Sequence, residues 1–246
     1  MAKIRGVLFD KDGTLIDFFS LWLAAARWAV PRFLKENGLK EELSETMFRA
    51  LGVRGERVDP EGGLAYKAYG EIAEDICRAL ARRQALLSPA AVREQLERLF
   101  AQYAGSGEVV YRPTADLEKL LLGLKTRDIR IGLATADTMQ SAESCLERLG
   151  VREQFDYVGA DDGRRRPKPE ADMFLEFERR FRLLPGQILM AGDTRNDMEF
   201  AKRCGGIAVA VLSGVGRRED LEDTADYILD DVGMIPELID RLGTPG

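Results

Sequence analysis

The stretch that decides the fold is residues 6–19, "GVLFDKDGTLIDFF", in which an apolar run ends in two carboxylates. Residues 4–9 form a short apolar run with β-branched and aromatic character that is bounded by Asp10 and Gly13, which predicts a buried strand that leads into a loop. Asp10 and Asp12 stand two residues apart. In an extended segment such residues point to the same side, so both carboxylates are expected at one site beyond this strand.

Further apolar runs predict further buried strands, and amphipathic segments between them predict helices. The expected strands cover residues 129–135, 187–193 and 206–212, with weaker ones at 156–160 and 226–230. The expected helices cover residues 115–124, 138–149, 171–181 and 196–204. Strands that alternate with helices predict an α/β fold, a doubly wound, Rossmann-like parallel sheet with helices on both faces.

One long segment, residues 17–106, interrupts this alternation. Its pattern is helical throughout, with no convincing strand, and its helices are expected at residues 21–37, 41–51, 64–83 and 89–103. We therefore expect a helical domain at 17–106, inserted between the two parts of a core at 1–16 and 107–246. The glycine-containing residues 104–114 are interpreted as the return linker.

Composition excludes several kinds of chemistry and partner. The net charge of −6 disfavours a general nucleic-acid or anionic-membrane surface, because either partner would be repelled. No apolar run approaches the ~20 residues of a spanning helix and the first residues do not resemble a signal peptide, so a cytoplasmic location is expected. Three scattered cysteines fit a reducing compartment. The chain has no histidine, so its chemistry must use carboxylates, hydroxyls, lysine and arginine, with or without a hard metal ion.

The acid pair after the first strand is the first candidate for that chemistry. Two crowded carboxylates repel, which raises the pKa of at least one of them unless a cation neutralises the pair. Mg²⁺ would do so, and a raised pKa would suit the other carboxylate to proton transfer. The plain alternative is a solvated strand end with an Asp-Gly turn.

Three later strand ends carry matching groups. The strand at 129–135 ends in Thr135, whose hydroxyl and following amides, from Ala136 on, can hold phosphate oxygens at a helix start. Lys168 stands between two prolines on a stiff loop, which makes it a positioned cation. Asp193 ends a third strand, and Asp197 opens the next helix. Each group alone has an ordinary structural explanation, but their joint occurrence at successive strand ends favours one catalytic site.

With these motifs the sequence resembles the haloacid dehalogenase superfamily, the Mg²⁺-dependent aspartyl phosphotransferases. "FDKDGT" is similar to the first motif of that family, "GLAT" to the second, "RPKPEADMF" to the third and "GDTRND" to the fourth. All four motifs occur in the family's order. The resemblance implies a catalytic core of that fold and, in residues 17–106, a helical cap that closes over the site.

The resemblance also implies catalytic and metal-binding roles. Asp10 would be the nucleophile that forms an aspartyl-phosphate, and Asp12 would protonate the leaving alkoxide and then take a proton from the attacking water. Mg²⁺ would be held by a carboxylate oxygen of Asp10, the backbone carbonyl of Asp12, and Asp193. Asp197 would bind the metal through water or orient Lys168.

The remaining implied contacts hold the phosphoryl group. Thr135, the amide of Ala136, Lys168 and the backbone amides around Lys11 and Asp12 would bind its oxygens. In such a site, positioning and electrostatic stabilisation do most of the catalytic work.

Departures from individual branches of the family narrow the choice. The acid at Asp12 disfavours carbon–halogen cleavage, since the dehalogenase branch lacks it. The lack of a cap histidine disfavours a phosphomutase of the β-phosphoglucomutase kind. A phosphonate hydrolase with a cap lysine stays open, because the insertion contains Lys35, Lys40 and Lys67.

We therefore predict a Mg²⁺-dependent phosphatase, similar to phosphoglycolate phosphatases, that acts on a small phosphorylated metabolite. The alternatives are a phosphomutase, a pyrophosphate or phosphonate hydrolase, or a non-catalytic binding protein. Arg54 and Lys67 in the insertion are candidates to meet a second anionic group of the substrate. The run 164–166, three arginines, is interpreted as a solvated loop in preference to a field that steers substrates. We expect a monomer or homodimer, with no nucleic-acid or membrane partner.

Overall fold

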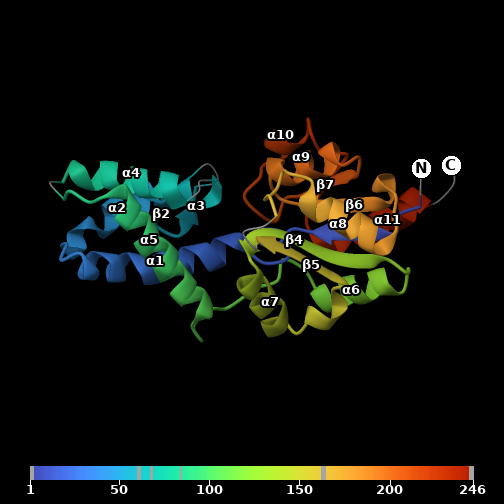
Figure 1. Ribbon diagram of the computed structural model, residues 1–246, viewed down its shortest axis with the longest axis horizontal. Helices are drawn as coiled ribbons and strands as arrows, with labels where there is room; N and C mark the ends of the chain where they lie inside the picture. Colours follow the sequence, from blue (N-terminus) through green and yellow to red (C-terminus); the bar gives the residue numbers. More distant parts are fainter. Residues whose placement is uncertain (1–2, 60–61, 67–68, 84, 162–164, 244–246) are drawn as a thin grey trace. The chain divides into compact units, whose positions relative to one another are not determined.

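The computed structural model describes residues 3–59, 62–66, 69–83, 85–161 and 165–243. The chain divides into two compact units (Figure 1). The core unit comprises Met1–Phe18 with Tyr111–Gly246, and the helical unit comprises Phe19–Val110. Within the described ranges, no helix combines the length and the apolar character needed to cross a bilayer.

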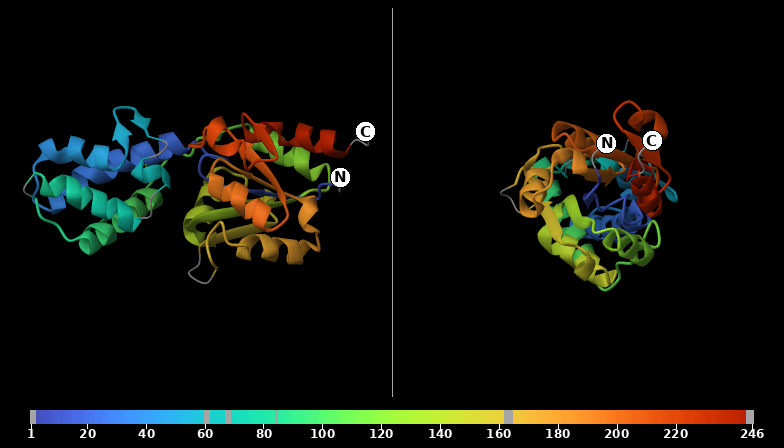
Figure 2. Two further views of the ribbon diagram at one scale, coloured as in Figure 1. Left: turned by 90° about the horizontal axis from the view of Figure 1, so that it is seen from above. Right: turned by 90° about the vertical axis from the view of Figure 1, so that its right-hand side faces the viewer.

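The core unit is built on a six-stranded sheet in which every neighbouring pair is parallel. Its strands are β1 (Gly6–Phe9), β4 (Arg130–Thr138), β5 (Tyr157–Asp161), β6 (Ile188–Gly192), β7 (Ile207–Val211) and β8 (Tyr227–Leu229). The spatial order is β5-β4-β1-β6-β7-β8, so β1 lies in the interior of the sheet (Figure 2). The predicted doubly wound α/β fold is confirmed.

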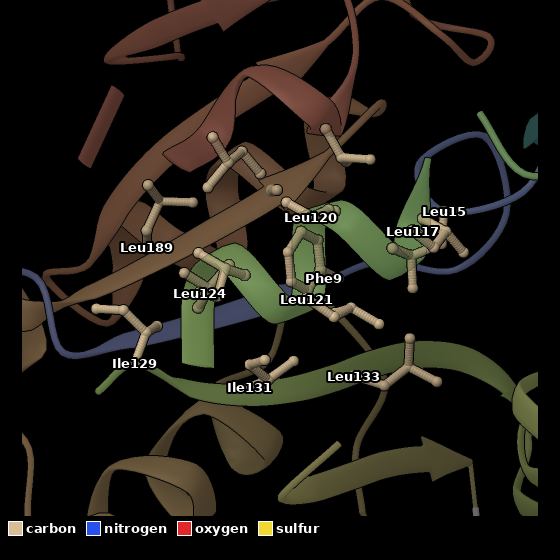
Figure 3. Close-up of a cluster of buried hydrophobic side chains, with 14 of the residues drawn as sticks. Phe9, Leu15, Leu117, Leu120, Leu121, Leu124, Ile129, Ile131, Leu133 and Leu189 are labelled. Atoms are coloured by element: carbon tan, nitrogen blue, oxygen red, sulfur yellow. The ribbon is translucent and has the colours of Figure 1, made fainter. Parts of the chain in front are cut away.

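Helices pack on both faces of this sheet. They are α6 (Leu117–Lys125), α7 (Met139–Arg148), α8 (Asp172–Phe181), α9 (Arg195–Arg203), α10 (Arg218–Leu221) and α11 (Ile235–Gly243), with single 3₁₀ turns at Arg152–Gln154, Pro185–Gln187 and Val232–Met234. One buried apolar cluster joins the sheet to α6, α7 and α11, and part of it is drawn in Figure 3. A second cluster joins the opposite face to α8, α9 and α10.

The alternation of side chains along β1 explains why this short strand is buried on both faces. Val7 and Phe9 enter the first cluster, whereas Leu8 enters the second. All four residues of β1 are buried. Along the chain, β4 and β5 extend the sheet on one side of β1, and β6, β7 and β8 extend it on the other. The loop after β1 therefore lies at the point where the strand order reverses, which is where open α/β sheets bind ligands.

The helical unit contains the helices that its sequence predicts, with differences in detail. They are α1 (Phe18–Glu36, which begins in the core unit), α2 (Ser44–Ala50) after a 3₁₀ turn at Glu41–Leu43, α3 (Gly63–Tyr66), α4 (Tyr69–Ala81) and α5 (Pro89–Gly105). The expectation of no strand here was wrong. Val53–Arg54 (β2) and Arg57–Val58 (β3) pair as a small antiparallel hairpin, because Gly55 adopts a φ of +60° in the two-residue turn.

Candidate functional site

The nucleophile candidate Asp10 directly follows β1 at the carboxyl edge of the sheet. Its backbone N–H donates to the carbonyl of Ala191 in β6, at 2.8 Å. The register pairs Phe9 with Leu133 of β4 on one side and with Ala191 on the other. Asp10 therefore stands between the ends of β4 and β6, where the loops of both strands can reach it.

Lys168 joins two of the predicted acids. Its Nζ donates to Oδ1 of Asp10 at 2.6 Å and to Oδ1 of Asp197 at 2.5 Å. The side chain of Lys168 is only 6 % exposed. Burial opposes its charged form, but the two carboxylates outweigh burial and raise the pKa of Lys168. The lysine is thus a fixed, fully charged cation at the sheet edge.

Asp197 divides its two carboxylate oxygens between the lysine and the start of α9. While Oδ1 accepts from Lys168, Oδ2 accepts from the backbone N–H of Thr194 at 3.1 Å and from its hydroxyl at 2.5 Å. Thr194 in turn caps the helix by accepting from the N–H of Asp197. The capping contacts hold Asp197 in place toward Lys168.

Asp193 is fully buried directly after β6. Its Oδ2 accepts from the backbone N–H of Val215 at 2.8 Å, and its Oδ1 accepts from the hydroxyl of Thr14 at 3.4 Å. The loops after β1 and β7 therefore both fix this carboxylate. The contribution of the loop after β7 was not predicted, although its two glycines in "LSGVG" are a signal of close backbone approach.

Glycines make room for Asp193. A Cβ at position 214 would lie 1.9 Å from Oδ2 of Asp193, and a Cβ at position 13 would lie 2.3 Å from the same atom. Gly13 also has a φ of +84°, which side chains rarely tolerate. Any larger residue at either position would push into the carboxylate.

The three acids at this edge form one electrostatic cluster. Carboxylate oxygens of Asp10, Asp193 and Asp197 lie within 4.8 Å of one another. Burial is the main cause that raises the pKa of Asp10 to about 7, with the charges of Asp197 and Asp12 adding to it against Lys168. Burial, Asp10 and Asp197 likewise raise the pKa of Asp193 well above its ordinary value. A site with this surplus of buried negative charge and only oxygen donors fits a hard divalent cation such as Mg²⁺.

The second predicted motif differs from expectation in its local structure. β4 continues to Thr138, three residues beyond the expected end at Thr135. Its pairing with β5 shifts register between Ala134 and Thr138, so Thr135, Ala136 and Asp137 lie in an irregular stretch. Thr135 is buried and its hydroxyl accepts from the N–H of Asp137 at 3.1 Å, whereas Ala136 is exposed.

Lys11 has a side-chain environment that its sequence did not indicate. Its Nζ lies 3.0 Å from Oδ2 of Asp12 and 2.8 Å from Oδ2 of Asp137. Burial raises the pKa of Asp12, against the effect of Lys11. For Asp137 the lysine outweighs burial and lowers the pKa. Asp137 was not predicted as a site residue, and the signal available was an acid two residues after Thr135, at the start of a helix.

The other predicted cationic residues are Arg54, Lys67 and the arginine run at 164–166. Arg54 lies in β2 with an exposed side chain, and Lys67 lies outside the described residues. Arg165 Nε donates to Oε2 of Glu176 at 2.7 Å, and Arg166 Nη2 donates to Oδ1 of Asp172 at 2.8 Å. These two arginines are paired with carboxylates of α8, and the first arginine of the run lies outside the described residues.

Comparisons with known proteins identify the family to which the chain is similar. The family model of the haloacid dehalogenase-like hydrolases matches residues 4–205 of the sequence. A phosphoglycolate phosphatase from Salmonella typhimurium is 27 % identical over 252 residues, which cover 100 % of this chain and 95 % of the relative. A tyrosine-protein kinase, PtkA, from Mycobacterium tuberculosis is also 27 % identical, over 96 % of this chain and 72 % of the relative. The crystal structure of a putative phosphatase from Clostridium difficile superposes with a TM-score of 0.71 at 18 % identity, covering 97 % of this chain and 100 % of that one.

Proposed function

Because the chain belongs to the haloacid dehalogenase-like hydrolases, we propose that it is a Mg²⁺-dependent phosphatase that hydrolyses a small phosphate monoester through an aspartyl-phosphate. One observation carries the proposal. Lys168 bridges Asp10 and Asp197 at 2.6 and 2.5 Å, beside Asp193, at the point where the strand order reverses. The lysine offers positive charge to phosphate oxygens, and the three carboxylates offer oxygen ligands to a divalent cation.

In the first step, a carboxylate oxygen of Asp10 attacks phosphorus and the bond from phosphorus to the ester oxygen breaks. Asp12 gives its proton to the departing alkoxide, so the alcohol leaves neutral. Lys168 donates to the phosphoryl oxygens as negative charge moves onto them. Thr135 and the amides of Ala136 and Lys11 hold the same oxygens, which keeps phosphorus in line with Asp10.

In the second step, water attacks phosphorus and the bond from phosphorus to the Asp10 oxygen breaks. Asp12, now a carboxylate, takes a proton from that water, and inorganic phosphate is released. Both steps therefore use the same two acids, with Asp12 first as acid and then as base. Asp12 is close enough to Asp10 that its charge raises the pKa of Asp10.

Asp10, Asp193, the backbone carbonyl of Asp12 and, directly or through water, Asp197 would hold Mg²⁺. When bound, the ion would neutralise phosphate charge and polarise the phosphoryl group. The raised pKa values of Asp10 and Asp193 are the reason to expect binding, because a cation relieves the same repulsion that protons relieve.

The proposed substrate class is a small phosphorylated metabolite of the cytoplasm. The relative from Salmonella typhimurium is named for phosphoglycolate, and a substrate of that kind carries a second anionic group that a cation such as Arg54 or Lys67 could bind. The three cysteines, Cys77, Cys145 and Cys204, are unpaired, which suits a reducing compartment.

A second candidate function follows from the relative that is named a tyrosine-protein kinase. In that case the phosphoryl group would pass to a tyrosine hydroxyl instead of water. Incubation with ATP and Mg²⁺, followed by detection of phosphotyrosine on the chain itself and on a tyrosine peptide, separates the two functions.

The main test is phosphate release from a panel with Mg²⁺: phosphoglycolate, sugar phosphates, nucleoside monophosphates, pyrophosphate and phosphonoacetaldehyde, with β-glucose 1-phosphate followed for isomer formation. We expect release from a phosphomonoester, loss of release in EDTA, and a fall of at least about a thousandfold in Asp10→Asn. Asp240→Asn, which changes an exposed acid of α11, is the matched control. No release from any compound, or an active Asp10→Asn variant, would overturn the proposal.

The non-catalytic alternative is tested by binding. Beryllium fluoride mimics the phosphoryl group on an aspartate, so with Mg²⁺ it should raise the Tm of the wild type and leave Asp10→Asn unchanged. A protein that binds neither Mg²⁺ nor the fluoride would have kept the fold without the reaction.

A further inference from the structure

Lys11 is a buried charge in a place where an apolar residue would fit the fold. Its side chain is 2 % exposed, although it stands in the loop directly after β1. Burying an ammonium group is costly, and an ion pair in such a place is often no more stable than well-packed apolar residues of similar volume. Stability alone therefore does not account for a lysine here.

The contacts of Lys11 lead to the predicted proton donor. Its Nζ lies 3.1 Å from Oδ1 and 3.0 Å from Oδ2 of Asp12, so the ammonium group spans both carboxylate oxygens. The carboxylate of Asp12 is 19 % exposed and, without such a contact, could rotate about its side-chain bonds. The lysine fixes the plane in which Asp12 presents its oxygens.

Asp137 anchors the lysine from the neighbouring strand. Its Oδ2 lies 2.8 Å from Lys11 Nζ and also accepts from the hydroxyl of Ser141 at 2.6 Å. Its Oδ1 accepts from the backbone N–H of Thr138 at 2.7 Å, and Thr138 caps α7 by accepting from the N–H of Ser141. Asp137 is thereby fixed to the start of a ten-residue helix that packs on the sheet. A continuous chain of contacts runs from α7 through Asp137 and Lys11 to Asp12.

We propose that Lys11 and Asp137 are positioning residues that hold the Asp12 carboxylate in the orientation for proton transfer to the leaving group. The inference rests on the proposed phosphatase function and adds two residues to it. Neither residue touches the substrate through its side chain in this scheme. They act through Asp12, and their effect should depend on how strongly the leaving group needs a proton.

That dependence provides the test. The leaving group of phosphoglycolate is the basic alkoxide of glycolate, which must be protonated, whereas the leaving group of p-nitrophenyl phosphate is p-nitrophenolate, which is stable without a proton. The ratio kcat/KM reports only the steps up to departure of the leaving group, so breakdown of the intermediate does not affect it. In Lys11→Met and Asp137→Asn we expect kcat/KM for the alkyl ester to fall at least about tenfold and for the aryl ester to fall less than about threefold. A phosphomonoester from the panel with an alkyl leaving group replaces phosphoglycolate if the wild type prefers it.

Two further variants complete the experiment. Lys119→Met, which removes an exposed lysine from α6, is the matched control and should leave both substrates unchanged. The double variant Lys11→Met with Asp137→Asn should lose no more than Lys11→Met alone, because both residues act through one chain of contacts. Circular dichroism and Tm of each variant establish that it is folded, and Asp137→Asn keeps the test open if Lys11→Met does not fold.

The outcomes distinguish this inference from the function on which it rests. If the wild type hydrolyses neither ester, the proposed function fails. If the wild type hydrolyses both, but the variants lose the two esters by the same factor or lose neither, the phosphatase stands and the positioning role is refuted. Additive losses in the double variant would also refute it.

Discussion

The substitution Gly214→Ala tests whether close backbone approach holds Asp193 in the site. The three atoms nearest to the added Cβ all belong to Asp193, at 1.9 Å from Oδ2, 2.3 Å from Cγ and 2.6 Å from Cβ. Contacts of a Cβ below 3.0 Å essentially never occur, so the carboxylate or the loop must move by at least 3.0 − 1.9 = 1.1 Å. The φ of Gly214 is not in the left-handed region, so the effect is one of contact alone.

The magnitude follows from what that displacement breaks. Overpacking of a filled site costs about 1–3 kcal/mol. The bond from the N–H of Val215 to Oδ2 of Asp193, 2.8 Å long, is charge-assisted, and losing it adds about 1.5–3 kcal/mol. We expect the free energy of unfolding of the metal-free protein to fall by about 3 kcal/mol and Mg²⁺ affinity to fall about 10- to 100-fold, since Asp193 is an expected ligand.

Urea unfolding in EDTA and calorimetric titration with Mg²⁺ measure the two effects. The matched control is Gly186→Ala, because a Cβ at that position meets no atom within 4 Å and its φ is not in the left-handed region. Because alanine lowers the conformational entropy of the unfolded chain, the control should be unchanged or stabilised by about 0.4–1 kcal/mol. If Gly214→Ala unfolds with the free energy of the control and binds Mg²⁺ equally well, the glycine does not position the acid and the reasoning is refuted.

Two other predictions concern the charges of the site in the metal-free protein. The folded pKa of Asp10 is raised from 3.8 to about 7, so its proton stabilises the fold below pH 4. That stability is lost as pH rises to 7, by about 4 kcal/mol at about 1.4 kcal/mol per pKa unit. In urea unfolding from pH 4 to 8, the unfolding free energy of the wild type should therefore fall relative to that of Asp10→Asn, and a constant difference between the two would contradict the prediction. Lys168→Met leaves Asp10 and Asp197 without their shared cation, so we expect its free energy of unfolding in EDTA to be lower by about 3–5 kcal/mol. Mg²⁺ should restore the stability of this variant but not its phosphate release. Equal Tm values for variant and wild type in EDTA would count against this ion-pair assignment.

The core of the fold was predictable because its strands are buried on both faces. Such strands are nearly continuous apolar runs, and β1, β6 and β7 are of this kind. The hairpin β2–β3 was missed because each of its strands has only two residues, too few for any periodicity to be read. Its only signal was a glycine between two valine–arginine pairs, in "VRGERV".

The site was predictable to the extent that its groups follow strands in the sequence. Parallel strands bring their carboxyl ends to one edge, so Asp10, Lys168, Asp193 and Asp197 could be assembled from their positions alone. The contacts of Asp193 with Thr14 and Val215 depend on how two loops fold back over the strand end. No spacing rule predicts a bond from a loop amide, and only the glycines on either side of Val215 indicated that the backbone comes close there.

The residue between Asp10 and Asp12 is as constrained as the two acids. The side chain of Lys11 is 2 % exposed, so its ammonium group is buried. A lysine in that position requires a carboxylate partner, since an unpaired buried ammonium would be too costly to keep charged. The neighbouring strand β4 ends close to Asp137, and the structure places that acid 2.8 Å from Lys11. The lysine of "DKDGT" is therefore as specific a feature of this chain as the two aspartates, because it ties the predicted proton donor to an acid on the next strand.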